Sequence, residues 1–387
     1  MFEVEGKFSL RQLINALRSV FLIAVVTMSA VPALAGNDLL LLPASESPRA
    51  SGAMLLDVAR AGQNLVAVGD RGHVLISENN GLSWQQSKVP VSVTLTAVHF
   101  PSATQGWVVG HDGVVLHSSD GGERWTLQFD GVKASQLLLE HYEKLVAAKE
   151  KELELATEDT REALTYELED LGFFLSDAQY GVEEGPWKPF LDVWFADEKT
   201  GYIVGAYGMM FRTTDGGASW QPWGDRLDNP QGLHLNAITG SAAGLFIAGE
   251  MGTLYKSTDG GDHWETLESP YEGSFFGAVA DEQGQLIVAM GLRGNAIRSV
   301  DGGATWQHIK SPNQAPLLGG TILPDGRVAI ASASLLFADN KADMLSASKV
   351  KPSVYSAVAV TADDQLVLVG LHGAKRIEWN MLEGEDK

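Results

Sequence analysis

The sequence predicts an all-β fold, a seven-bladed β-propeller. Three observations indicate this class: an octet ending in tryptophan returns along the chain, a glycine-containing turn precedes each copy, and the units recur about every 41 residues. The octets are S-S-D-G-G-E-R-W at 118–125, T-T-D-G-G-A-S-W at 213–220, S-T-D-G-G-D-H-W at 257–264, S-V-D-G-G-A-T-W at 299–306 and the weaker S-E-N-N-G-L-S-W at 77–84.

The count of seven follows from the spacing of the first glycine in each unit. Those positions are Gly69, Gly110, Gly205, Gly249, Gly291, Ser332 as a stand-in, and Gly370. Only the step from Gly110 to Gly205 is too long, and removing an insert of about 50 residues restores the repeat.

Each unit predicts short strands A to D. An apolar stretch, such as residues 94–100 or 189–195, forms strand A, and strand B ends at Val-Gly. A tight turn then leads to strand C, and the octet turns strand C into strand D.

The octets predict structural turns. Their carboxylates can accept N–H bonds from the glycine turn that follows, and their indoles can pack between neighbouring hairpins. The residues concerned are Asp120, Trp125, Asp215, Trp220, Asp259, Trp264, Asp301 and Trp306. The alternative is a calcium or catalytic carboxylate site. A ring does not normally need five reaction centres, and Asn79 in the weaker copy carries no carboxylate.

The octets match the Asp-box, also called the bacterial neuraminidase (BNR) repeat. Residues 95–125 and 191–220 resemble the photosystem II stability and assembly factor family, and the resemblance covers nearly all of residues 55–380 outside the insert. It implies a seven-bladed propeller of the thylakoid lumen that acts as a non-enzymatic chaperone for early photosystem II intermediates. Related propellers also occur in bacteria that lack photosynthesis.

Residues 1–35 are expected to be a signal peptide. Three basic residues precede an apolar run over residues 21–31, and Ala33-Leu34-Ala35 offers a small-x-small cleavage pattern. A retained anchor is the alternative, although the run is short for about 30 Å of hydrocarbon. Cleavage would deliver an exported protein to the periplasm, or to the thylakoid lumen in a photosynthetic source.

Residues 36–387 are assigned to the propeller. The last unit supplies strands at 355–360, 366–370 and 374–379 and no fourth strand. Because an open ring leaves two sheet edges exposed, we expect the apolar run at residues 39–42 to complete the seventh blade.

Residues 130–185 form the insert, which lies between blades two and three. Its long stretch without glycine or proline predicts two helices of about 20 residues each. The insert holds fifteen acidic and five basic residues, close to half of the net charge of −21. Two interpretations remain: a solvated helical hairpin packed on itself, or a projecting arm that binds a partner.

The sequence contains no recognised catalytic, cofactor or metal motif, so we expect no catalytic residue, no cofactor and no metal. The absence of cysteine excludes thiol chemistry, and the negative charge opposes nucleic acid and anionic lipid. Sialidases with this repeat need clustered arginines, whereas the arginines here fall at different places in the repeat.

In a propeller blade the B–C turn and the D-to-A crossover lie on one face, opposite the C–D turns. The insert is a D-to-A crossover, so it should share a face with the B–C turns, which vary most between repeats. We call this the varied face, and the opposite one the octet face. The candidate partner-binding residues are Asp70, Arg71, His111, Asp112, Tyr207, Glu250, Met251, Leu292, Arg293 and His372.

The predicted function is therefore non-enzymatic: an exported assembly or stability factor, or an accessory subunit, for a membrane protein complex. The resemblance implies a photosystem II intermediate, and a non-photosynthetic source would imply an envelope complex such as a transporter. We expect a protein that is peripheral to the membrane and monomeric when alone. The alternative is a glycan-binding or sialidase-like propeller.

Overall fold

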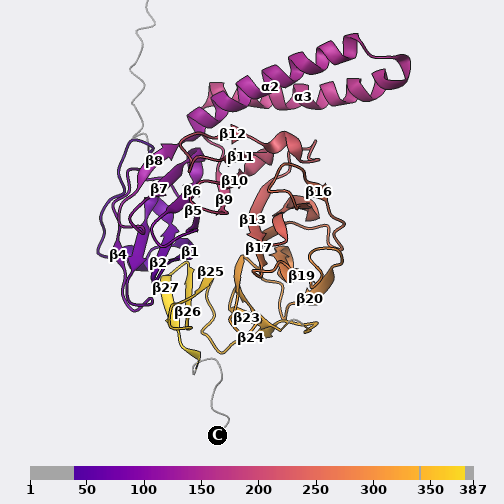
Figure 1. The fold of residues 1–387 in the computed structure, drawn as a ribbon. Helices are drawn as coiled ribbons and strands as arrows, with labels where there is room; N and C mark the ends of the chain where they lie inside the picture. Colours follow the sequence, from indigo (N-terminus) through magenta and orange to yellow (C-terminus); the bar gives the residue numbers. More distant parts are fainter. Residues whose placement is uncertain (1–38, 340, 380–387) are drawn as a thin grey trace, which may run out of the picture. The chain divides into compact units, whose positions relative to one another are not determined.

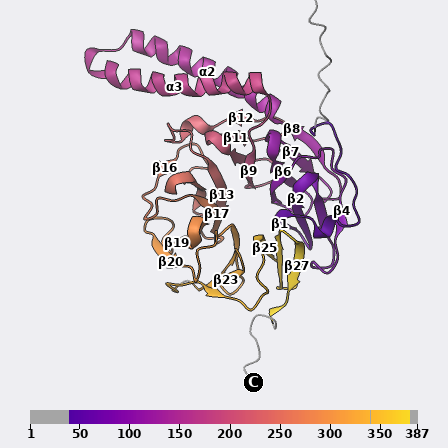
Figure 2. The same ribbon diagram turned by 180° about the vertical axis from the view of Figure 1, so that it is seen from behind.

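A computed structural model describes residues 39–339 and 341–379, which form seven antiparallel sheets around a ring (Figures 1 and 2). The predicted seven-bladed propeller is therefore confirmed. Six sheets have four strands, and the seventh has three. The predicted signal peptide lies outside the described residues.

The strands of the first three blades are β1 (Leu55–Ala61), β2 (Asn64–Gly69), β3 (Val74–Ser77) and β4 (Gln85–Gln86); β5 (Leu95–His99), β6 (Gly106–Gly110), β7 (Val115–Ser118) and β8 (Thr126–Phe129); β9 (Phe190–Phe195), β10 (Gly201–Gly205), β11 (Met210–Thr213) and β12 (Gln221–Pro222). The next three comprise β13 (Leu235–Ser241), β14 (Gly244–Gly249), β15 (Leu254–Ser257) and β16 (Glu265–Thr266); β17 (Phe275–Ala280), β18 (Ile287–Gly291), β19 (Asn295–Ser299) and β20 (Gln307–Lys310); β21 (Gly319–Ile322), β22 (Val328–Ala331), β23 (Leu335–Ala338) and β24 (Ser346–Ala347). Blade seven holds β25 (Tyr355–Val360), β26 (Leu366–Gly370) and β27 (Gly373–Ile377).

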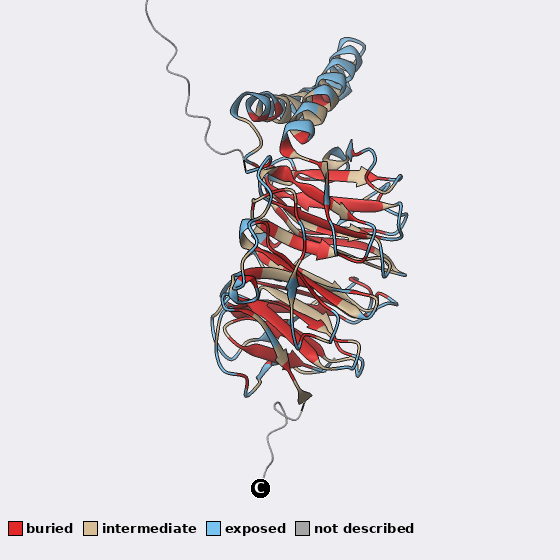
Figure 3. Cartoon of the chain, turned by 90° about the vertical axis from the view of Figure 1, so that its left-hand side faces the viewer, coloured by how far each residue is buried: buried red, intermediate tan, exposed pale blue. Residues whose placement is uncertain are grey.

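The inner strands of the blades are largely buried. Strands β6, β10, β18 and β26 are buried at every residue, because each lies inside its sheet and neighbouring blades cover both faces (Figure 3). Such strands read as continuous apolar runs instead of alternating ones. Packing also explains the glycine at the end of these strands. At the end of β2, for example, a Cβ at Gly69 would lie 2.2 Å from the carbonyl oxygen of Met54.

Five B–C turns share one conformation, a short 3₁₀ turn closed by glycine. They are η2 (Asp70–Gly72), η3 (His111–Gly113), η4 (Ala206–Gly208), η6 (Glu250–Gly252) and η7 (Leu292–Gly294). The middle residue is left-handed in all five, with φ between 52° and 58°. Two further 3₁₀ turns are η1 (Ala50–Gly52) and η5 (Gly224–Arg226).

The insert folds into two antiparallel helices, α2 (Gly131–Glu154) and α3 (Glu158–Glu184), which we call the arm (Figure 1). The Asp130 carboxylate caps α2 by accepting a bond from the Lys133 amide at 3.0 Å. Thr157 occupies the N-cap of α3. The helices have 24 and 27 residues, so they are longer than predicted. Among residues 39–339 and 341–379, no helix is both long and apolar enough to cross a membrane.

The predicted ring closure is wrong. Residues 39–42 form no strand, and blade seven remains three-stranded. The Leu39 carbonyl instead accepts a bond from the Ser92 amide at 2.9 Å, and Leu40 packs against Val89 and Val91. Only Leu40 of this run is buried against blades one and two, whereas Leu39, Leu41 and Leu42 are exposed.

Packing and polar contacts between blades one and seven close the ring. Strand β1 packs against β25 and β26. The Arg376 guanidinium donates to the Asn80 carbonyl at 2.7 Å and pairs with Asp363. The facing surfaces of the sheets in blades one and seven are apolar, so the ring closes although blade seven has no fourth strand.

Candidate partner-binding face

The octet turns are held by two hydrogen bonds of different kinds. In the second blade, the Ser118 hydroxyl accepts the Gly122 amide at 2.9 Å, and the Asp120 carboxylate accepts the Arg124 amide at 3.0 Å. The third, fourth and fifth blades repeat both bonds. The predicted bond from glycine to carboxylate is therefore corrected: the hydroxyl takes the glycine amide, and the carboxylate takes the amide two residues later.

These bonds favour the ionised carboxylates. The Thr305 hydroxyl and amide lower the pKa of Asp301 to about 2, and contacts with Ser219 lower the pKa of Asp215. Each carboxylate sits on its own blade, and no group of three metal-ligating side chains occurs in the described part of the chain. The indoles of Trp125 and Trp220 are buried, while those of Trp264 and Trp306 are half-buried.

The varied face exposes apolar side chains at several B–C turns. The exposed fractions are 41% for Tyr207, 60% for Met251 and 37% for Leu292. Met54 and Val354 are also exposed. They lie beside such turns, since their carbonyls accept the amides of Asp70 and Leu371.

The charged candidates partly pair with their neighbours. Arg71 and Asp70 lie 3.6 Å apart, and Glu250 lies 3.2 Å from His234 Nδ1. His111, Arg293 and His372 are exposed at their turns, and Asp112 is half-buried. The predicted residues therefore share one face but form no single cluster.

An aromatic cluster joins the arm to this face. Trp187 packs edge-on against Tyr207 with ring centres 5.1 Å apart, and Tyr207 lies 4.8 Å from the ring of His234. The buried Lys188 ammonium lies 5.4 Å from the Tyr207 ring and pairs with Asp177 of α3. Trp187 and Lys188 were not predicted from the sequence, although a tryptophan directly after a helical insert is a usable signal.

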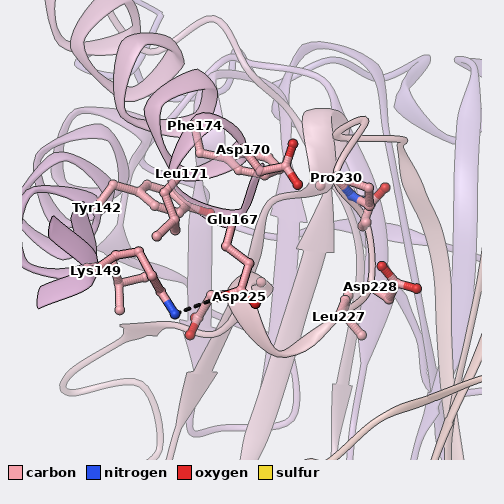
Figure 4. A pocket seen from close by; sticks show the side chains of 14 residues that line it. Tyr142, Lys149, Glu167, Asp170, Leu171, Phe174, Asp225, Leu227, Asp228 and Pro230 are labelled. Carbon is pink, nitrogen blue, oxygen red and sulfur yellow. Dashed lines mark hydrogen bonds and ion pairs between the residues drawn. The ribbon is translucent and has the colours of Figure 1, made fainter. Parts of the chain in front are cut away.

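A cleft of about 370 Å³ lies between the arm and the crossover that follows blade three (Figure 4). Tyr142 and Leu171 of the helices face Leu227 and Pro230 of the crossover. His141 anchors the arm nearby through a 3.0 Å contact with Asp225. Lys149 in the same cleft is bonded to Glu167 at 2.6 Å.

A central channel of about 440 Å³ is lined by the A strands of all seven blades. Two carboxylates in it bridge adjacent blades: Asp57 accepts the Val98 amide at 2.9 Å, and Asp192 accepts the Ile238 amide at 2.8 Å. The repeated Leu-Asp-Val at 56–58 and 191–193 is the sequence signal that was missed.

Burial in the channel shifts the pKa values of two of its side chains. Burial, then the charge of Asp57, raises the pKa of Asp192 to about 7. Burial lowers the pKa of His99 to about 4. No arginine lines the channel, so the described residues place no clustered arginines of the sialidase kind there.

The fold and its repeated octets define a BNR-type β-propeller. The family model described as photosynthesis system II assembly factor YCF48 matches residues 76–141 and 181–311, about half of the chain, and the chain belongs to this family. The matched segments leave out residues 142–180, which form most of the arm. No curated protein matches the sequence significantly.

Several solved structures share the fold. YCF48 bound to D1 peptide has a TM-score of 0.57 and 14% identity, covering 86% of this chain and 97% of that one. YCF48 from Cyanidioschyzon merolae has a TM-score of 0.56 and 14% identity, with coverages of 85% and 96%. The WD40 propeller domain of Doa1 has a TM-score of 0.56 at 9% identity, with coverages of 87% and 95%. Identities this low establish the fold alone.

Proposed function

We propose that the protein is a non-catalytic assembly or accessory factor, which holds a segment of a membrane protein on the varied face. Family membership supports the assembly role, and a relative of the same fold is known with a D1 peptide bound. In a photosynthetic source the partner would be a photosystem II intermediate, and otherwise an envelope complex such as a transporter. The protein would be exported, peripheral to the membrane and monomeric when alone.

The observation that carries the proposal is the unequal distribution of exposed apolar side chains. The varied face exposes Met54, Trp187, Tyr207, Met251, Leu292, Val354 and Leu371. Among the large apolar residues of the described chain, the C–D turns of the octet face expose only Leu82, Val300 and Met344. Apolar side chains set among charged ones suit a protein interface.

The test replaces residues 132–182 with a short Gly-Ser loop and measures partner capture from membranes by the purified protein. We expect the propeller to fold, as judged by its circular dichroism and melting curve, and capture to fall at least tenfold. The matched control is Leu82→Ser with Val300→Ser on the octet face, which should capture normally. Full capture by the loop variant, or loss of capture only in the control, would refute the proposal.

A further inference from the structure

Helix α3 carries a stripe of exposed aromatic rings. Tyr166, Phe173 and Tyr180 are 61%, 57% and 52% exposed. They are spaced by seven residues, so at about 100° per residue successive rings are offset by only about 20°. The stripe is therefore nearly straight, and it runs for roughly 21 Å along the helix at 1.5 Å per residue.

The stripe is not needed to hold the arm together. The buried residues of α3 are Leu164, Ala178 and Gly181. Leu164 and Ala178 lie roughly 120–160° round the helix from Tyr166, and Gly181 has no side chain. Phe174, next to the central ring of the stripe, stacks on Tyr142 of α2 at 5.4 Å. The rings of Phe173 and Phe174 meet edge-on at the same distance, and both lie beside Gly232 of the crossover that follows blade three. The central ring of the stripe is therefore held in place by its neighbours while it remains 57% exposed.

The charge beside the stripe is of one sign. Helix α3 has nine acidic residues and a single basic one, Arg161, which lies roughly 100–140° round the helix from the three rings. Glu162, Glu169, Asp170 and Glu184 flank the rings, and no ion pair links their carboxylates to another described residue. This surface attracts a cationic partner and repels a second copy of itself or an anionic membrane.

The spacing of the rings favours a helical partner over an extended strand. Neighbouring rings are roughly 10.5 Å apart along the axis, which equals the distance between residues i and i+7 of an adjacent helix. An extended strand advances about 3.3 Å per residue, so three residues cover this distance. Residues i and i+3 of a strand point to opposite sides, and only one could face the stripe.

We infer that the α3 stripe docks a cationic amphipathic helix of the partner. The apolar seam of that helix would pack on the rings, and its lysines or arginines would meet the flanking carboxylates or lie over the ring faces. This inference rests on the proposed function, because it specifies what the arm contributes to partner recognition.

The test uses a designed, fluorescently labelled 21-residue helical peptide with leucine at heptad positions a and d and lysine at e and g. Binding to the full chain is followed by fluorescence anisotropy. We expect the variant Tyr166→Ser, Phe173→Ser, Tyr180→Ser to bind at least tenfold more weakly, whereas Leu155→Ser at the exposed hairpin tip binds normally. Added salt should weaken binding, and Glu162→Lys with Glu169→Lys and Glu184→Lys should shift preference toward a peptide with glutamate in place of lysine.

Equal binding by the stripe variant would overturn the inference. So would equal binding of the glutamate peptide to the unmodified chain, or of a proline-containing version that cannot form a helix. A dimer that the stripe substitutions dissociate would assign the stripe to a second copy. Peptide binding by residues 36–387 but not by the full chain would mean that the N-terminal segment covers the stripe. The dimer result and this result would each count against the inference. If the stripe variant captures the membrane partner normally while the Gly-Ser loop variant does not, the proposed function stands and this inference fails.

Discussion

Asp215 illustrates how one side chain organises an octet turn. Its carboxylate accepts the Ser219 amide at 2.9 Å and the hydroxyls of Thr213 and Ser219. Asn79 occupies the same place in the first octet and accepts the Ser83 amide at 2.9 Å without a charge. The hydrogen-bond geometry, more than the charge, therefore matters in these turns.

Asp215→Ala should destabilise the fold by about 1–2 kcal/mol, because the Ser219 amide and the two hydroxyls lose their acceptor. Asp215→Asn should cost less than half as much, as the natural asparagine in the first octet suggests. Urea denaturation of both variants measures the difference. Equal losses would mean that charge dominates, and loss of partner capture without destabilisation would contradict the structural role.

The channel residues Asp192 and His99 give opposite pH dependences. The pKa of Asp192 is about 7, raised from 3.8, so between these values the folded state holds a proton that the unfolded chain lacks. The free energy of unfolding therefore falls as pH rises through this window. His99 has a pKa lowered from 6.5 to about 4, so the unfolded chain binds the extra proton, and stability rises with pH between these values.

Relative to the unmodified protein, Asp192→Asn should make the slope of unfolding free energy against pH more positive between pH 4.5 and 6.5. His99→Gln should make it more negative. Denaturation at several pH values measures both slopes, and the comparison with the unmodified protein cancels the other titrating groups. Slopes that do not change would contradict the assignment of these pKa shifts to the channel.

At the scale of the elements, the repeat made the blades predictable. The predicted spans 355–360 and 366–370 coincide with β25 and β26, because a buried apolar strand ending at Val-Gly is a strong local pattern. The insert was recognisable for the same reason, since its helical pattern interrupts a regular spacing.

The closure was not predictable from the sequence. Four leucines at 39–42 predict burial, but only Leu40 is buried, because the contacts of this run with Val89 and Ser92 depend on distant residues. The Trp187–Tyr207 contact was missed for the same reason, because its two residues are brought together only when the arm docks. Local patterns specify elements, whereas contacts between elements require the folded structure.

Arg376 offers a direct test of the closure. Arg376→Ala should destabilise the protein by about 1–3 kcal/mol, because Asp363 and the Asn80 carbonyl lose their shared donor between blades seven and one. Arg376→Lys should recover only part of this, since lysine cannot make the forked contact. Thermal melting measures both variants, and a melt unchanged in Arg376→Ala would show that apolar packing alone closes the ring.

At the scale of the whole molecule, the two faces of the ring differ. The octet face repeats nearly the same turn around much of the ring, whereas the varied face carries different side chains at each B–C turn, together with the arm. The arm adds fifteen acidic residues against five basic ones, so it concentrates negative charge on one side of blades two and three. Such an asymmetry suits recognition on one face and stability on the other.

The most direct test of the central claim is site-specific photo-crosslinking in membranes. A photoreactive amino acid is placed at Tyr207 on the varied face or at Leu82 on the octet face, both of which are exposed. If the partner binds the varied face, position 207 should crosslink to a membrane protein and position 82 should not. Crosslinks only from position 82, or equally from both, would contradict binding on the varied face.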